Sequence, residues 1–183
     1  MERRPIRWHD PGPGTRVALL VVAYLALVWL SFEHGPYATL EGLVETLPEE
    51  TFGWGERGLD ARLEVLGEAG RDAYWQFQIA DFLAAGFAAI VLMAVIQWGA
   101  HTFGGEDSAL HHLSTLPLLL FLAEVVENVG LVFLSVSWPD LPGSIVSLAS
   151  WATRAKFVLG GATFVGAAVA TLAGWWALWI TRG

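Results

Sequence analysis

Four apolar runs, each long enough to cross a bilayer as a helix, constrain this chain more than any other feature. A hydrocarbon core about 30 Å thick requires roughly 20 residues of α-helix. In lipid a helix also satisfies its own backbone hydrogen bonds, which an irregular segment cannot do. The sequence therefore predicts an all-α fold, a single integral membrane domain over residues 1–183. Its four-helix bundle would have spans at about residues 16–33, 75–98, 115–138 and 151–176.

Composition agrees with a membrane protein and excludes several soluble classes. With 55% hydrophobic residues and a mean hydropathy of +0.51, the chain has too little polar surface for a soluble domain. The formal charge of -8 is local, because ten of the eighteen carboxylates lie between residues 33 and 72. Ten scattered Lys and Arg residues form no basic face for nucleic acid. The absence of cysteine excludes disulfides and thiolate sites.

Cationic residues predict the orientation of the spans. Four arginines precede or begin the first run and predict a cytoplasmic N-terminus. Four spans then return the C-terminus to the same side and leave residues 34–74 outside. The loop at residues 99–112 would also be cytoplasmic, although it has no Lys or Arg. No small-x-small cleavage site follows the first run, so we expect it to remain as a helix rather than to be removed as a signal. The four arginines are Arg3, Arg4, Arg7 and Arg16.

The long first loop, residues 34–74, has helical patterns of its own. Two apolar faces predict two short amphipathic helices, lying on the outer membrane surface or over the mouth of the bundle. Gly67 and Gly70 are expected to end the second of them. Residues 139–150 are expected to form a turn before the fourth span. The two apolar faces are Leu40, Leu43, Val44 and Leu47, then Leu59, Leu63 and Leu66.

Small residues recur every fourth position in the fourth span and cluster in the second. Such ridges let another helix approach closely, so we interpret both as packing surfaces. The residues are Ala162, Gly166, Ala170 and Gly174 in the fourth span, and Ala84, Ala85, Ala88 and Ala89 in the second.

Five polar side chains inside the spans are the candidate functional residues. A central Asp or Lys costs about 2.5–3.5 kcal/mol on insertion, so these groups must face one another or water. Three of them, at positions 124, 127 and 128, share one helical face, and Tyr74, Gln78 and Asp81 share a face of the second span. The five are Asp81, Glu124, Glu127, Asn128 and Lys156.

Tryptophans near the span ends give an estimate of depth, because indole rings settle at the headgroups. At 1.5 Å per residue, Asp81 lies about 9 Å beyond Trp75 and Lys156 about 8 Å beyond Trp151. The matched depths predict an ion pair between Asp81 and Lys156.

The two glutamates lie deeper by the same measure. Counted from Trp138, Glu127 and Glu124 are roughly 17 and 21 Å deep, nearer the midplane. The polar groups would then form a series leading inward from the outer face. A protonated carboxyl beside an ionised one also suits acid and base chemistry, which makes Glu124, Glu127 and Asp81 the catalytic candidates.

These residues predict an intramembrane cavity that opens toward the outer side and holds a lipid or small amphiphile, either bound or chemically changed. One alternative is a proton- or cation-conducting subunit, whose path would continue toward Gln97. Others are interhelical hydrogen bonds that only hold the bundle together, or an accessory protein whose loop holds a partner. Membrane lipid is the expected partner, a homo-oligomer is left open, and no cofactor is expected. The predicted lining is Tyr74, Gln78, Asp81, Glu124, Glu127, Asn128 and Lys156.

Histidines and acids share the loop at residues 99–112, but no two of them have the tight spacing of a helical metal site. We therefore expect a solvated loop and no metal. The residues are His101, Glu106, Asp107, His111 and His112.

The run from Leu66 to Tyr74, followed by Asp81, Glu127, Asn128 and Lys156, resembles small uncharacterised four-span bacterial membrane proteins. That resemblance implies a bacterial inner membrane and no particular activity. In topology alone the chain is also similar to the emopamil-binding and sigma-2 receptor group. Those four-helix proteins have buried carboxylates that face sterol-like or amine ligands. None of that group's motifs is found, so no residue is carried over from it.

Overall fold

The computed structural model describes residues 12–181, and within them the chain forms helices and no β-strand. Arg3, Arg4, Arg7 and Arg182 lie outside the described residues. Four long helices are each long and apolar enough to cross a membrane. They are α1 (Pro13–His34), α3 (Glu56–Gly104), α4 (Thr115–Ser137) and α5 (Gly143–Ile180), with a short α2 (Pro36–Leu40) and short 3-10 helices at Pro48–Glu50, Gly105–Asp107 and Ala109–Ser114.

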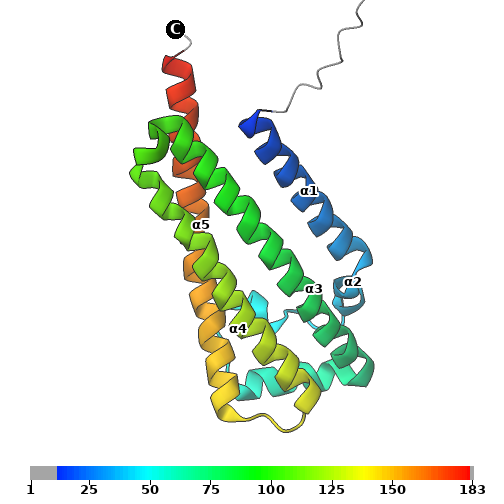
Figure 1. The fold of residues 1–183 in the computed structure, drawn as a ribbon. Coiled ribbons are helices and arrows are strands. Elements are labelled where there is room, and N and C mark those ends of the chain that lie inside the picture. Colours follow the sequence, from blue (N-terminus) through cyan, green and yellow to red (C-terminus); the bar gives the residue numbers. More distant parts are fainter. Residues whose placement is uncertain (1–11, 182–183) are drawn as a thin grey trace, which may run out of the picture.

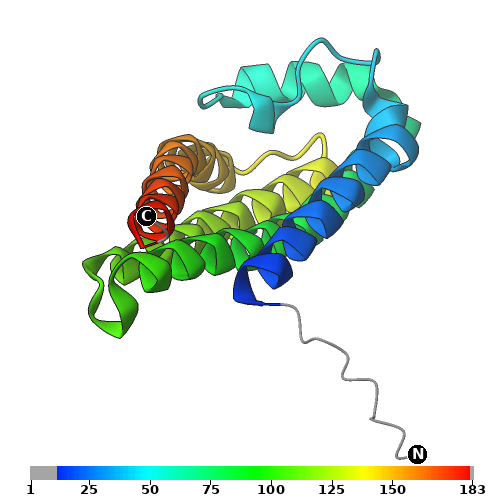
Figure 2. The same ribbon diagram turned by 90° about the horizontal axis from the view of Figure 1, so that it is seen from above.

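Helices α3, α4 and α5 form a three-helix core, and α1 lies against its side along α3 (Figures 1 and 2). None of the residues of α1 is buried, whereas each of the other three long helices has a buried face. The predicted bundle is therefore uneven: three helices share one core, and the fourth is attached to its surface.

Helix α3 bends sharply at Gly67, where φ is +64° and the backbone is not helical. Residues 56–66 lie across the end of the bundle, and residues 68–104 run along it (Figure 1). Gly67 thus ends the second amphipathic helix as predicted, because glycine enters this left-handed region without a steric cost. The prediction for Gly70 is wrong, since this residue lies inside the helix that follows.

Residues 36–66, here called the lid, cover the end of the bundle where α4 finishes and α5 begins (Figures 1 and 2). The prediction of a helix over residues 40–47 is wrong: α2 ends at Leu40, and Gly42 takes a positive φ of 85°. Apart from Leu43, which is exposed, the apolar residues of both predicted faces still pack the lid against the bundle. The largest buried cluster contains Leu40, Leu47, Trp54, Leu59, Leu63 and Leu66 of the lid with Tyr74, Leu131, Leu134, Val146 and Ala149 of the bundle.

The fourth span begins earlier than expected, at Gly143, so the predicted turn is limited to the residues before it. Further along α5, Gly166, Ala170 and Gly174 are buried, which confirms most of the predicted ridge. Gly99 of α3 lies so close to α5 that an added Cβ would collide with the carbonyl oxygen of Ala170. Ala162 lies on the exposed side and takes no part in this contact.

Candidate functional site

A largely buried lysine, Lys156, joins α5 to α4. The Nζ of Lys156 contacts Oε2 of Glu127 and lies 3.6 Å from Oε2 of Glu124. The Glu127 side chain has no exposed surface. In such surroundings an ion pair is costly to break, because removing one partner leaves the other charge buried alone. The predicted ion pair between Lys156 and Asp81 is therefore wrong, because the acidic partner of Lys156 is Glu127.

The depth estimate failed because Trp138 is not at the level of the other tryptophans. Its Nε1 donates a hydrogen bond of 2.9 Å to Asp60 in the lid, and the Arg71 guanidinium lies 4.1 Å from the centre of its ring. Trp138 thus belongs to the contact between the lid and the bundle. Depths counted from it are too large, and Lys156 is close enough to reach the glutamates of α4.

Asp81 instead pairs with an amide. The Nδ2 of Asn128 donates a hydrogen bond of 3.1 Å to Oδ2 of Asp81 and so links α4 to α3. Glu124, Glu127 and Asn128 share a face of α4, and that face meets both neighbouring helices. Lys156 approaches it from one side and Asp81 from the other.

Glu49 of the lid is a buried carboxylate that the sequence analysis missed. Tyr74 donates a hydrogen bond of 2.7 Å to its Oε2, and Gln78 donates one of 2.8 Å to its Oε1. Burial raises the pKa of Glu49 from 4.5 to about 7, against the opposing effect of the Tyr74 hydrogen bond. Tyr74 and Gln78 are therefore bound to the lid. No sequence signal separates Glu49 from the other eight acids of its loop.

Trp54 fastens the lid to the start of α5. Its backbone N–H donates a hydrogen bond of 2.9 Å to Oγ of Ser150, and its indole Nε1 donates one of 3.1 Å to Oγ1 of Thr153. Together with the apolar cluster, these bonds close the end of the bundle that was expected to be open.

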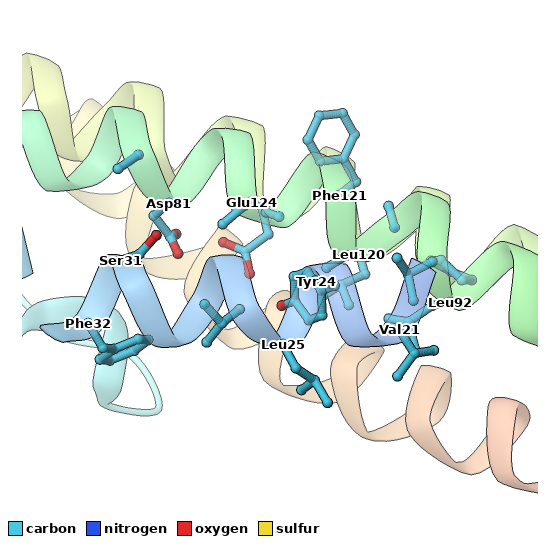
Figure 3. Close-up of a pocket in the computed structure, with 18 of the residues that line it drawn as sticks. Val21, Tyr24, Leu25, Ser31, Phe32, Asp81, Leu92, Leu120, Phe121 and Glu124 are labelled. Carbon is cyan, nitrogen blue, oxygen red and sulfur yellow. The ribbon is translucent and has the colours of Figure 1, made fainter. Parts of the chain in front are cut away.

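A cavity of about 420 Å³ lies instead at the side of the bundle, between α1 and the three-helix core. The carboxyl groups of Asp81 and Glu124 point toward α1, with Ser31 and Tyr24 on α1 opposite them (Figure 3). Tyr37 is the fifth polar residue of its lining. The remaining walls are apolar and include Val21, Leu25, Val28, Phe32, Phe77, Leu92, Val95, Leu120, Phe121 and Phe164.

The alanine cluster of the second span lines this cavity. Ala84, Ala85, Ala88 and Ala89 were interpreted as a packing surface for another helix, but their small side chains form the α3 wall of the cavity. The space remains open because α1 does not pack tightly against this face, and none of the residues of α1 is buried.

Within residues 12–181, the cavity provides no polar path toward the other end of α3. Gln97 donates a hydrogen bond of 2.8 Å to Oγ of Ser114 and contacts Nδ1 of His111, which ties it to the neighbouring loop. Between Glu124 and this point the cavity wall is formed by apolar residues such as Leu92 and Val95. Residues 12–181 bring no three potential metal-binding side chains together, and His101 pairs at 3.4 Å with Glu106.

Two of the seven predicted lining residues, Asp81 and Glu124, therefore face the cavity. The other five lie beside it in contacts between helices or with the lid. Tyr24 was missed, although a tyrosine in the middle of an apolar run is itself a signal, because its hydroxyl needs a polar partner away from the headgroups.

Comparison with known proteins identifies no relative of this chain: no protein-family model matches it, and neither the curated proteins nor the solved structures contain a match. Its function must therefore be inferred from the cavity, the charges around it and the way the lid closes the bundle.

Proposed function

We propose that this chain is a multi-pass protein of the bacterial inner membrane that binds a lipid or small amphiphile in the cavity between α1 and the three-helix core. Both termini would be cytoplasmic and the lid outside. One observation carries the proposal: the cavity has apolar walls and two carboxyl groups, those of Asp81 and Glu124. An amphiphile has the same division, with a long apolar part and a polar head.

The outward faces of the four long helices support a membrane location. Large apolar side chains are exposed along each of them, far more than a soluble surface carries. In a bilayer these side chains would meet acyl chains. They include Leu19 and Val22 of α1, Leu83 and Ile90 of α3, Leu122 and Val129 of α4, and Val158 and Leu172 of α5.

The charges around the cavity indicate which kind of polar head the ligand would carry. Lys156 provides one positive charge, whereas Asp81, Glu124 and Glu127 provide three negative charges if all are ionised, a sum of -2. Neighbouring carboxylates are not both ionised in a low dielectric without compensation. Lys156 is already in contact with Glu127. The carboxyl groups in the cavity wall therefore favour a head that donates hydrogen bonds, either a hydroxyl or an amine.

The alternatives receive less support. A conducting path would need polar groups between Glu124 and Gln97, and the cavity wall there is apolar. An accessory protein that uses its loop to hold a partner would need a free loop, and the lid is packed and hydrogen-bonded to its own bundle. The two carboxyl groups would also serve as acid and base if the bound molecule were chemically changed.

Native mass spectrometry of the protein purified in mild detergent tests the proposal. The wild type is expected to retain a small amphiphile, and Ala88→Leu is expected to lose it, because the larger side chain fills the cavity. Ala168→Leu makes the same change on the exposed face of α5 and serves as the control. Glu124→Gln, which keeps the size but not the charge, should weaken retention. Unchanged retention in both Ala88→Leu and Glu124→Gln would contradict the proposal.

A further inference from the structure

A second hollow lies on the outer face of α5, apart from the cavity under α1. It is a shallow groove lined by Phe52 of the lid and by Trp151, Arg154, Ala155, Val158 and Leu159 of α5. None of these residues lines the cavity under α1. Arg154 is the only charged residue in the groove lining, and the other five are apolar or aromatic.

Arg154 is held in a fixed position. Its guanidinium lies 4.8 Å from the centre of the Trp151 ring. On the other side is Gly53, where an added Cβ would collide with Nε of Arg154. Gly53 has a positive φ of 82°, which favours glycine, and Trp54 bonds the adjoining lid to α5. The backbone of the lid thus approaches the guanidinium at a site that only glycine allows easily.

The charge of Arg154 is not balanced within the described part of the chain. Residues 12–181 provide no acidic side chain within 4 Å of it and no acceptor for its N–H groups. A guanidinium has five donors in a planar fork that matches the oxygens of a phosphate. Its counter-charge must therefore come from water, ions or a bound molecule.

The groove would lie at the depth of lipid head groups. Arg154 is one helical turn beyond Trp151, or about 4.5 Å along the axis, and tryptophan marks the membrane interface. Beyond Arg154, toward the middle of α5, the surface is apolar, and Val158 is 64% exposed. A phosphate at Arg154 would thus continue into an apolar strip of the same helix.

We propose that Arg154 binds the phosphodiester of a membrane phospholipid, whose acyl chain lies along Val158 and Leu159 with the rings of Trp151 and Phe52 beside it. This site shares the membrane location with the function proposed above and is independent of the cavity under α1. A soluble anion fits the surface less well, because the groove is apolar apart from Arg154.

Native mass spectrometry with delipidated protein tests this site. The protein is titrated with phosphatidylglycerol, with a diacylglycerol that lacks the phosphate, and with inorganic phosphate. The wild type is expected to bind phosphatidylglycerol about tenfold more tightly than Arg154→Gln does, because the charged fork is lost. Arg57→Gln removes an exposed arginine outside the groove and should bind as the wild type does.

Arg154→Lys keeps the charge and provides a second variant should Arg154→Gln fold poorly. It is expected to bind phosphatidylglycerol about threefold less tightly than the wild type, because lysine lacks the planar fork. Equal binding by the wild type, Arg154→Lys and Arg154→Gln would overturn the proposal. Equal affinity of the wild type for diacylglycerol and for phosphatidylglycerol would also overturn it, because binding would then depend on apolar contacts alone. Displacement of the lipid by millimolar inorganic phosphate would show a site for a soluble anion instead.

Discussion

Glu127 is the most deeply buried carboxylate of the polar cluster, and Lys156 is the group that compensates its charge. The two side chains connect α4 to α5, while Asn128, the next residue, connects α4 to Asp81 of α3. Two adjacent residues of α4 thus bond to the two neighbouring helices, one to α5 and the other to α3. This arrangement leaves Glu124 at the edge of the cluster, where it reaches the cavity and remains within 3.6 Å of Lys156.

A double-mutant cycle should identify the true partner of Lys156. Glu127→Gln and Lys156→Met are each expected to lower the free energy of unfolding by about 3 kcal/mol, because each leaves a charge without its closest partner inside the bundle. The double variant should lose less than the sum. The cycle is measured by unfolding in mild detergent. A matched cycle with Asp81→Asn in place of Glu127→Gln should show weaker coupling. Equal coupling in the two cycles would contradict the assignment.

Glu49 should make stability depend on pH. Its pKa in the folded chain, about 7, lies above the usual 4.5, so the folded state binds the proton more tightly. This contribution, about 3 kcal/mol at most, is complete below pH 4.5 and is lost as the pH rises to about 7. The midpoint temperature of thermal unfolding of the wild type should therefore decrease as the pH is raised from 5 to 8.

Glu49→Gln is expected to remove much of that slope and to be more stable than the wild type at pH 8, since glutamine stays neutral. Glu45→Gln changes an exposed acid of the same lid and serves as the control. If the slope is the same in Glu49→Gln and in the wild type, Glu49 is not the group that titrates.

The sequence identified most of these residues but not their partners. A charge within an apolar run is costly wherever its side chain points, so Asp81, Glu124, Glu127 and Lys156 could be found by position alone. Their pairing depends on helix offsets and side-chain rotamers, which no spacing along one helix contains. Glu49 could not be found, because its burial results from the folding of the lid over Tyr74 and Gln78.

Helices α3 and α5 approach each other closely enough for their backbones to be in contact. At Gly99 the two backbones leave no room for a side chain, and Gly174 packs on the same residue. Helix α1 has no comparable contact and no buried residue. The α-helical segments were predictable from their apolar runs, and the third span agrees with the prediction to within one residue. The position of α1 outside the core could not be predicted from the sequence, because its run is as apolar as the other three.

Replacing Gly99 should separate α3 from α5. Gly99→Val is expected to destabilise the protein by about 2 kcal/mol or more, because the added methyl groups meet the backbone of Ala170. Gly161→Val makes the same change on α5 where nothing lies within 4 Å and should have little effect. Thermal unfolding in detergent compares the two. Similar melting temperatures for both variants would mean that the close approach is absent.

At the scale of the whole molecule, the lid and the loop of residues 105–114 lie at opposite ends of the bundle (Figure 1). They should therefore be accessible from opposite sides of the membrane. The chain has no cysteine, so single cysteines can be introduced at the exposed positions Glu45 and Asp107. An impermeant thiol reagent on intact cells should label Glu45→Cys and spare Asp107→Cys until the cells are opened. Labelling of Asp107→Cys alone would invert the orientation.

The position of α1 also determines where a ligand of the cavity comes from. The lid closes the end of the bundle, whereas the side of the cavity is covered by α1, which buries none of its residues, together with Pro36 and Tyr37 of the lid. Such a ligand would enter sideways, by diffusion within the plane of the bilayer. Its occupancy would then follow its mole fraction among the lipids rather than its concentration in water. Adding ligand-free lipid to a fixed amount of protein and ligand would dilute the ligand and empty the site, with no change in the intrinsic affinity.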